Sequence, residues 1–187
     1  MLKETYDEQY RPTFHFTEKE TFINDPNGLV YDSNTGIYHM FYQYHPGITA
    51  EGSLYWGHAV SKDLVRWEKK EIAIEPDENG VIFSGSCVVD EKNDSGLFPD
   101  MLEAGSRLVA IFTYHSDNPS IAIAYSTDYG ETWKEYGKVI ANENNMYSNH
   151  FRDPTNIRRP GSNLGAFDYP GYYEQKHLLI VMAFPLC

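Results

Sequence analysis

The sequence predicts an all-β protein built from repeated four-stranded sheets, as in a β-propeller. Apolar residues occur in short blocks that alternate with polar residues or run for about four to eight positions, which is typical of strands. Turn-forming residues separate these blocks, as at 32–36, 77–80 and 92–96. The same order of segments returns roughly 60 residues later, which is the pattern of propeller blades.

The predicted strands follow one another without a convincing amphipathic helix between them. In chain order they are GLVYD at 28–32, IYHMFYQYH at 37–45, YWGHAV at 55–60, EIAIE at 71–75, SCVVD at 86–90, RLVAIFTYH at 107–115, IAIAYS at 121–126 and LLIVMAF at 178–184.

The repeat divides the chain into an N-terminal segment, 1–20, and a partial propeller, 21–187. We expect blade one at about 21–75, blade two at about 80–145 and the start of blade three at 150–187. Propellers close with about four to eight blades, so about two and a half blades predict an incomplete ring. Exposed blade edges would make an oligomer possible.

The charge and hydropathy of the chain limit the classes of partner that it can bind. A formal net charge of −12 disfavours nucleic acid and anionic membranes and suits a neutral small molecule. No run approaches the roughly 18 apolar residues of a spanning helix, and the first residues lack an apolar signal-peptide core. We expect a soluble protein, either cytoplasmic or secreted and already processed.

The densest polar cluster, Asn24 to Gly28, lies at the start of the first predicted inner strand. Its residue types are those of an ordinary β-turn. However, Asp25 and Asp153 occupy corresponding places in two units, and each precedes a proline. Inner strands of a propeller converge on its axis, and two carboxylates brought together there are the equipment of a glycosidase.

The motifs of this chain resemble those of glycoside hydrolase family 32, which includes invertase, inulinase and levanase. Phe22 stands where the family usually carries Trp. The resemblance covers residues from about 13 to 154 and rests on six motifs in family order: Phe22 to Gly28, Phe41 to Pro46, Tyr55 to His58, Asp63 and Leu64 with Trp67, Phe83 to Ser86, and Phe151 to Pro154.

This resemblance implies a five-bladed β-propeller of the fructosidase type and a retaining β-fructofuranosidase. Asp25 would be the nucleophile, and Asp153 would stabilise the transition state. The substrate would be a small carbohydrate with a terminal fructofuranosyl unit, and no cofactor or metal is implied. The fructose subsite would be lined by Phe22, Asn24, Gln43, Trp56, Phe83, Ser84 and Arg152, with Trp56 offering a stacking face.

The general acid and base is not identified. The family uses a Glu followed by Cys, whereas Cys87 follows Ser86 and Cys187 follows Leu186. Glu174, in a polar segment, is not assigned the role. Without an acid we expect the chain alone to lose about two to four orders of magnitude in turnover of sucrose.

Two other interpretations stay open at this point. One is a truncated, catalytically inactive carbohydrate-binding protein. The other is a sialidase-like propeller, because Ser126 to Trp133 fits the Asp-box pattern, with a degenerate copy at Ser61 to Trp67. The sequence does not choose among sucrose, inulin, levan and sucrose phosphate, nor between hydrolysis and fructosyl transfer.

Overall fold

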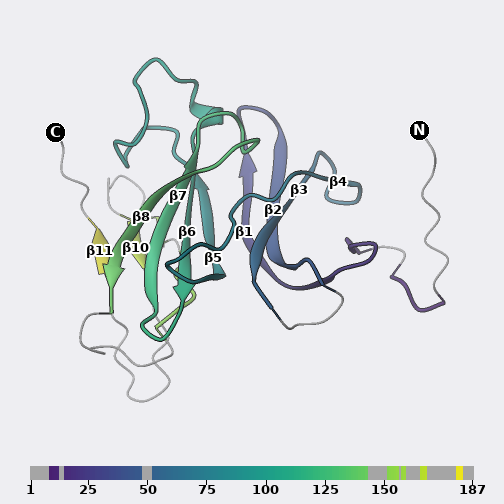
Figure 1. Ribbon diagram of the computed structural model, residues 1–187. Helices are drawn as coiled ribbons and strands as arrows, with labels where there is room; N and C mark the ends of the chain where they lie inside the picture. The colour runs from purple at the N-terminus through teal and green to yellow at the C-terminus, as the bar shows by residue number, and fades with distance from the viewer. Residues whose placement is uncertain are drawn as a thin grey trace.

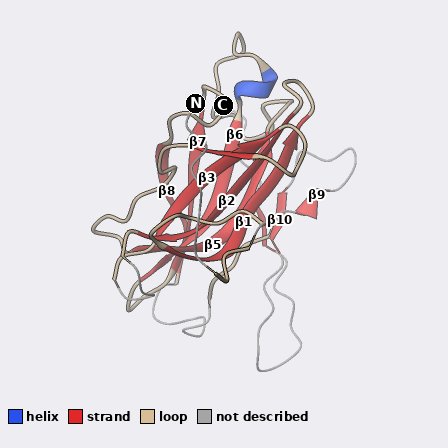
Figure 2. Ribbon diagram, turned by 90° about the vertical axis from the view of Figure 1, so that its right-hand side faces the viewer, coloured by secondary structure: helices blue, strands red, loops and turns tan. Residues whose placement is uncertain are grey.

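The computed structural model describes residues 9–12, 15–47, 52–142, 151–155, 157–158, 165–167 and 180–182. They form two four-stranded antiparallel sheets and a small third sheet, which follow one another across the molecule (Figure 1). The only helical element in these ranges is a single 3-10 turn, η1, at Ala104–Ser106, and it lies at one end of the strands (Figure 2). The prediction of an all-β chain is confirmed.

The first sheet contains β1 (Phe22–Asp32), β2 (Ile37–His45), β3 (Tyr55–Ser61) and β4 (Trp67–Lys69), in that spatial order. A tight turn joins β1 to β2, as the run of polar residues at 32–36 predicts. Asp32 accepts a hydrogen bond from the Asn34 backbone N–H at 2.9 Å, and Gly36 takes the left-handed conformation that ends the turn (φ 72°).

The predicted strand at 71–75 is wrong. The outer strand of this sheet is β4, and Ile74 makes only an isolated bridge with Trp56. Ala73 and Ile74 are apolar because they are buried in the core cluster with residues of both sheets. Their alternation with polar residues therefore reflects burial of a loop rather than a ladder.

The second sheet contains β5 (Val81–Val89), β6 (Leu108–His115), β7 (Ser120–Ser126) and β8 (Lys134–Ala141), again in chain order. Both faces of this sheet are covered, so β6 is buried along nearly its whole length. This explains why its sequence is a continuous apolar run rather than an alternating one. The strand β8, which begins with exposed charged residues, was not among the predicted strands.

The two sheets pack face to face through β1 and β5. The core between them includes Phe41, Trp56, Ile82, Leu108 and Phe112. Gly28 of β1 lies against β5, and a Cβ placed on it would lie 2.8 Å from Cys87 Cβ and 2.8 Å from Phe41 Cδ2. The close approach of the sheets therefore requires glycine at this position.

The third sheet consists of β9 (Ile157–Arg158), β10 (Gly165–Phe167) and β11 (Ile180–Met182), in the order β11-β10-β9. Of the predicted strand at 178–184, the described part is β11. The motif at 151–154 precedes this sheet as irregular backbone, so Asp153 does not begin a strand as the repeat suggested. Among the described residues, no helix is long and apolar enough to cross a membrane.

Candidate functional site

Two β-bulges present polar residues at the same end of the two sheets. In β1 the register jumps between Ile23 and Pro26, so Asn24 and Asp25 together face a single residue of β2. In β5 it jumps between Phe83 and Gly85, which leaves Ser84 unpaired. Bulges re-aim side chains away from a regular ladder. Here they expose polar groups of the motifs that the sequence singled out.

The two bulges are joined by a hydrogen bond between the sheets. The Ser84 hydroxyl donates to the Asp25 carboxylate, Oγ to Oδ2, at 3.1 Å. Behind this pair, the Gly85 N–H donates to the Asn27 side-chain oxygen at 3.4 Å. Asp25 is exposed and Asn27 is buried, so Asp25 faces solvent while Asn27 anchors the strand below it.

The Arg152 to Pro154 segment reaches this end of the second sheet through two hydrogen bonds. The Asp153 N–H donates to the Thr113 hydroxyl at 3.0 Å, and the Ser86 hydroxyl donates to the Pro154 carbonyl at 3.1 Å. Asp153 takes a left-handed conformation (φ 61°), which is uncommon for a residue with a side chain and often marks a functional position.

The two carboxylates of the site, Asp25 and Asp153, have one neighbouring positive charge within the described part of the chain, that of Arg152. Burial raises the pKa of Asp153; the Arg152 guanidinium opposes that rise and the nearby charge of Asp25 adds to it. Arg152 Nε lies 3.5 Å from Asp153 Oδ2, with both side chains about half exposed. Asp25 and Asp153 are thus close enough to interact electrostatically, as the pairing of their motifs predicted.

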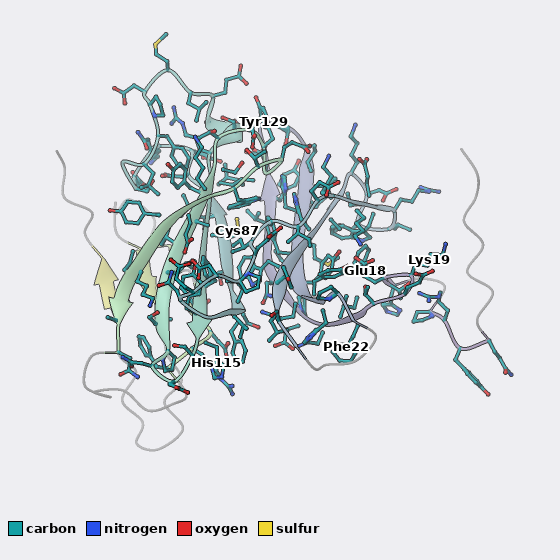
Figure 3. All side chains as sticks on the ribbon, viewed as in Figure 1. Glu18, Lys19, Phe22, Cys87, His115 and Tyr129 are labelled. Atoms are coloured by element: carbon teal, nitrogen blue, oxygen red, sulfur yellow. The ribbon has the colours of Figure 1, made fainter. Side chains whose placement is uncertain are left out.

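Two aromatic side chains of the predicted subsite each pack against a histidine. Phe22 meets His45 edge to face, with ring centroids 5.0 Å apart, and Phe83 stacks on His115 at 4.0 Å. Phe22 and His115 mark the lower end of the two sheets in Figure 3, whereas Tyr129 lies at the upper end. Burial lowers the pKa of both histidines, which favours neutral imidazoles.

Trp56 does not offer the ring face that was expected for sugar stacking. Its side chain is fully buried, because it packs against Phe41 and Phe112 between the sheets. Its indole N–H donates to the Phe83 carbonyl at 3.1 Å, so it supports the bulge of β5 from below. Trp56 therefore lies beneath the predicted subsite and does not form part of its surface.

Gln43, the residue of β2 opposite the β1 bulge, is also buried. Its side chain is 2% exposed, yet neither its amide oxygen nor its amide nitrogen has a partner among the described residues. A buried amide without partners is costly, and a ligand or water that reaches it would relieve that cost.

Several residues that shape this end of the sheets were not among those predicted. Thr113 could have been noticed as the one aliphatic hydroxyl inside the apolar run of β6. The histidines that end β2 and β6 occupy matching places in the two sheets, but nothing in the sequence showed what they contact. Glu174 lies outside the described residues. Within those residues, no group of three possible metal ligands comes together.

At the opposite end of the sheets, the Asp-box turns have a structural role. The Asp128 carboxylate accepts from the Ser126 hydroxyl at 2.7 Å and from the Thr132 backbone at 2.9 Å, closing the β7 to β8 turn. Trp133 donates from its indole to the Gly130 carbonyl and packs edge-on against Phe41. The box therefore stabilises the fold, far from the Asp25 bulge.

Comparison with known proteins agrees with this geometry. Residues 15–164 match the model of the glycosyl hydrolases family 32 N-terminal domain. The chain is 49% identical over 154 residues to a levanase of Bacillus subtilis and 48% identical over 157 residues to an invertase of Schizosaccharomyces pombe. These alignments cover 80% of this chain in both cases, and 21% and 26% of the relatives.

Solved structures show the same fold. A fructofuranosidase from Schwanniomyces occidentalis, complexed with fructose, superposes with a TM-score of 0.76 at 44% identity, covering 89% of this chain and 33% of that one. An exo-inulinase from Aspergillus awamori gives 0.75 at 36% identity, covering 88% and 36%. The chain thus spans about a quarter of the curated relatives and about a third of the solved structures.

These matches confirm the fructosidase type of propeller, of which the two four-stranded sheets are blades, and they favour it over a sialidase. The family match extends over most of the chain and includes both bulges and the segment that carries Asp153. The chain belongs to glycosyl hydrolase family 32, and its matching part is the family's N-terminal domain.

Proposed function

We propose that this chain carries the fructose-binding end of a retaining β-fructofuranosidase, with Asp25 as the nucleophile. The observation that carries the proposal is the exposed Asp25 carboxylate, held by Ser84 across the blade interface and close enough to Asp153 to influence its ionisation. Relatives named levanase and invertase, and a similar structure complexed with fructose, support this substrate class.

In this mechanism an ionised Asp25 attacks the anomeric carbon of a terminal fructofuranosyl unit. The bond from that carbon to the leaving oxygen breaks, a proton goes to that oxygen, and a covalent fructosyl ester forms on Asp25. Water then hydrolyses the ester, so the configuration is retained. The Ser84 hydrogen bond fixes the orientation of the Asp25 carboxylate.

Arg152 and Asp153 bind the sugar hydroxyls beside the reacting carbon. Thr113 fixes the Asp153 backbone, and Arg152 offsets part of the charge that two neighbouring carboxylates bring together. The unpartnered Gln43 amide and the exposed Asn24 amide supply further donors and acceptors for vicinal hydroxyls. Phe22 and Phe83 provide the apolar walls.

The proton for the leaving group comes from outside the described residues. A chain that binds fructosides without cleaving them is the competing function, and it would keep the same contacts with the sugar. Turnover that depends on Asp25 distinguishes the enzyme from the binding protein, whereas affinity for the sugar does not.

The test measures fructose released from a β-fructofuranosyl donor with an activated leaving group, which needs no general acid, by the chain and by its Asp25→Asn variant. The variant keeps the shape and an acceptor for Ser84 but removes the nucleophile, so turnover should fall by at least about a thousandfold. Asp100→Asn, an exposed carboxylate in the loop between β5 and β6, is the matched control and should keep full activity. Fructose binding by a chain that shows no turnover would favour the binding protein.

A further inference from the structure

The His45 imidazole lies directly behind the β1 bulge and touches two residues of the proposed site. It ends β2, is 3% exposed and faces Phe22 across the ladder. Its Nε2 lies 3.2 Å from the side-chain oxygen of Asn24. Its other ring nitrogen, Nδ1, is buried and has no partner among the described residues.

We propose that His45 is a positioning residue that donates from Nε2 to the Asn24 oxygen and thereby turns the Asn24 amide N–H groups toward the substrate. The inference rests on the proposed function, and it assigns to Asn24 one orientation out of two. An amide without a fixed partner presents its oxygen or its nitrogen to a sugar hydroxyl with similar ease.

Three features of the structure fix this hydrogen bond. A neutral imidazole has one N–H, and placing it on Nε2 pairs it with Asn24, the one hydrogen-bond partner of the ring among the described residues. The Phe22 ring, edge-on at 5.0 Å, restricts rotation of the imidazole. The Phe22 N–H in turn donates to the Gly47 carbonyl at 3.0 Å, which holds the strand end in place.

Asn24 needs such support because it lies in the bulge and lacks a ladder partner. It is exposed, and its neighbour Asp25 is held by Ser84. His45 therefore does for Asn24 what Ser84 does for Asp25, from the same sheet instead of the adjacent one. Both contacts set side-chain direction where the backbone leaves it undetermined.

The experiment compares His45→Leu, which fills the space without a donor, with His45→Gln, which retains a donor of similar reach. The kcat/KM for a β-fructofuranosyl donor with an activated leaving group should fall about tenfold in the first variant and about twofold in the second. In an Asn24→Ala background, His45→Leu should cause no further loss. A purely structural role for His45 would instead give equal losses in both backgrounds and would overturn the proposal.

A second readout does not depend on turnover. Nitrogen NMR of the His45 ring should show a neutral imidazole protonated at Nε2, and a ring protonated at Nδ1 alone would overturn the assignment. His58→Leu, a buried histidine of the same sheet at the far end, is the control for general destabilisation and should leave kcat/KM unchanged. A wild-type chain that neither binds fructose nor cleaves the activated donor would refute the proposed function, while the ring spectrum would still decide the His45 contact.

Discussion

Replacing Gly28 by alanine should push the two blades apart. Gly28 has φ of 51°, where an L side chain costs about 1 to 2 kcal/mol. Its added Cβ would lie 2.8 Å from Cys87 Cβ and from the Phe41 ring. That ring is itself fixed, because it stacks on His58 at 4.4 Å and meets Trp133 edge-on at 5.3 Å.

Since neither neighbour can move freely, overpacking adds about 1 to 3 kcal/mol, and the total loss of unfolding free energy should be about 2 to 5 kcal/mol. Gly36→Ala is the matched control, because Gly36 also has a positive φ (72°) but an added Cβ would meet nothing within 4 Å. Urea unfolding followed by circular dichroism measures both. Equal losses in the two variants would refute the close packing of β1 on β5.

Two further predictions concern a buried histidine and a hydroxyl of the site. Burial lowers the pKa of His58 from its usual value to about 3, so the unfolded chain takes up a proton first as the pH falls. His58 should therefore contribute a loss of about 2 kcal/mol of stability between neutral pH and about pH 5, and His58→Leu should reduce the pH dependence by that amount in urea titrations. Thr113→Val removes the acceptor for the Asp153 N–H and should lower kcat/KM about tenfold in steady-state assays with a β-fructofuranosyl donor that carries an activated leaving group.

Each of these predictions has its own control. A pH dependence that persists unchanged in His58→Leu would assign the effect to other groups and contradict the role of burial. For Thr113, the control is Thr132→Val, which also loses a hydroxyl hydrogen bond, to Asp128 at 2.5 Å, but at the opposite end of the sheets. Equal activity of the two variants would contradict the anchoring of Asp153.

Most of the fold could be predicted because blade strands differ clearly from the turns between them. Within the two four-stranded sheets, the strands that were not predicted are the outer ones. β4 is three residues long, and β8 begins with exposed charged residues, so neither gives a clear apolar signal. The segment at 71–75 gave that signal without forming a strand, since Ala73 and Ile74 are buried as a loop. Hydrophobic periodicity reports burial, and burial usually but not always means a strand.

The candidate site was predicted as a set of residues but not as an arrangement. Motif order singled out Asp25, Ser84 and Asp153, and the structure connects them through bulges and through Thr113. Register shifts are not visible in a sequence, because a bulge inserts a single residue without changing the polar and apolar pattern much. Trp56 was expected at the surface of the site because its role was taken from the family resemblance, which does not show how deeply a side chain is buried.

The nucleophilic role of Asp25 is tested most directly by reacting the chain with a β-fructofuranosyl donor that carries an activated leaving group. Such a donor needs no general acid, so the outcome does not depend on where that residue lies. Mass spectrometry of peptides from the quenched reaction should find one added fructosyl unit on the peptide that contains Asp25, and none in Asp25→Asn. Release of fructose without an adduct, or an adduct that persists in the variant, would contradict the assignment.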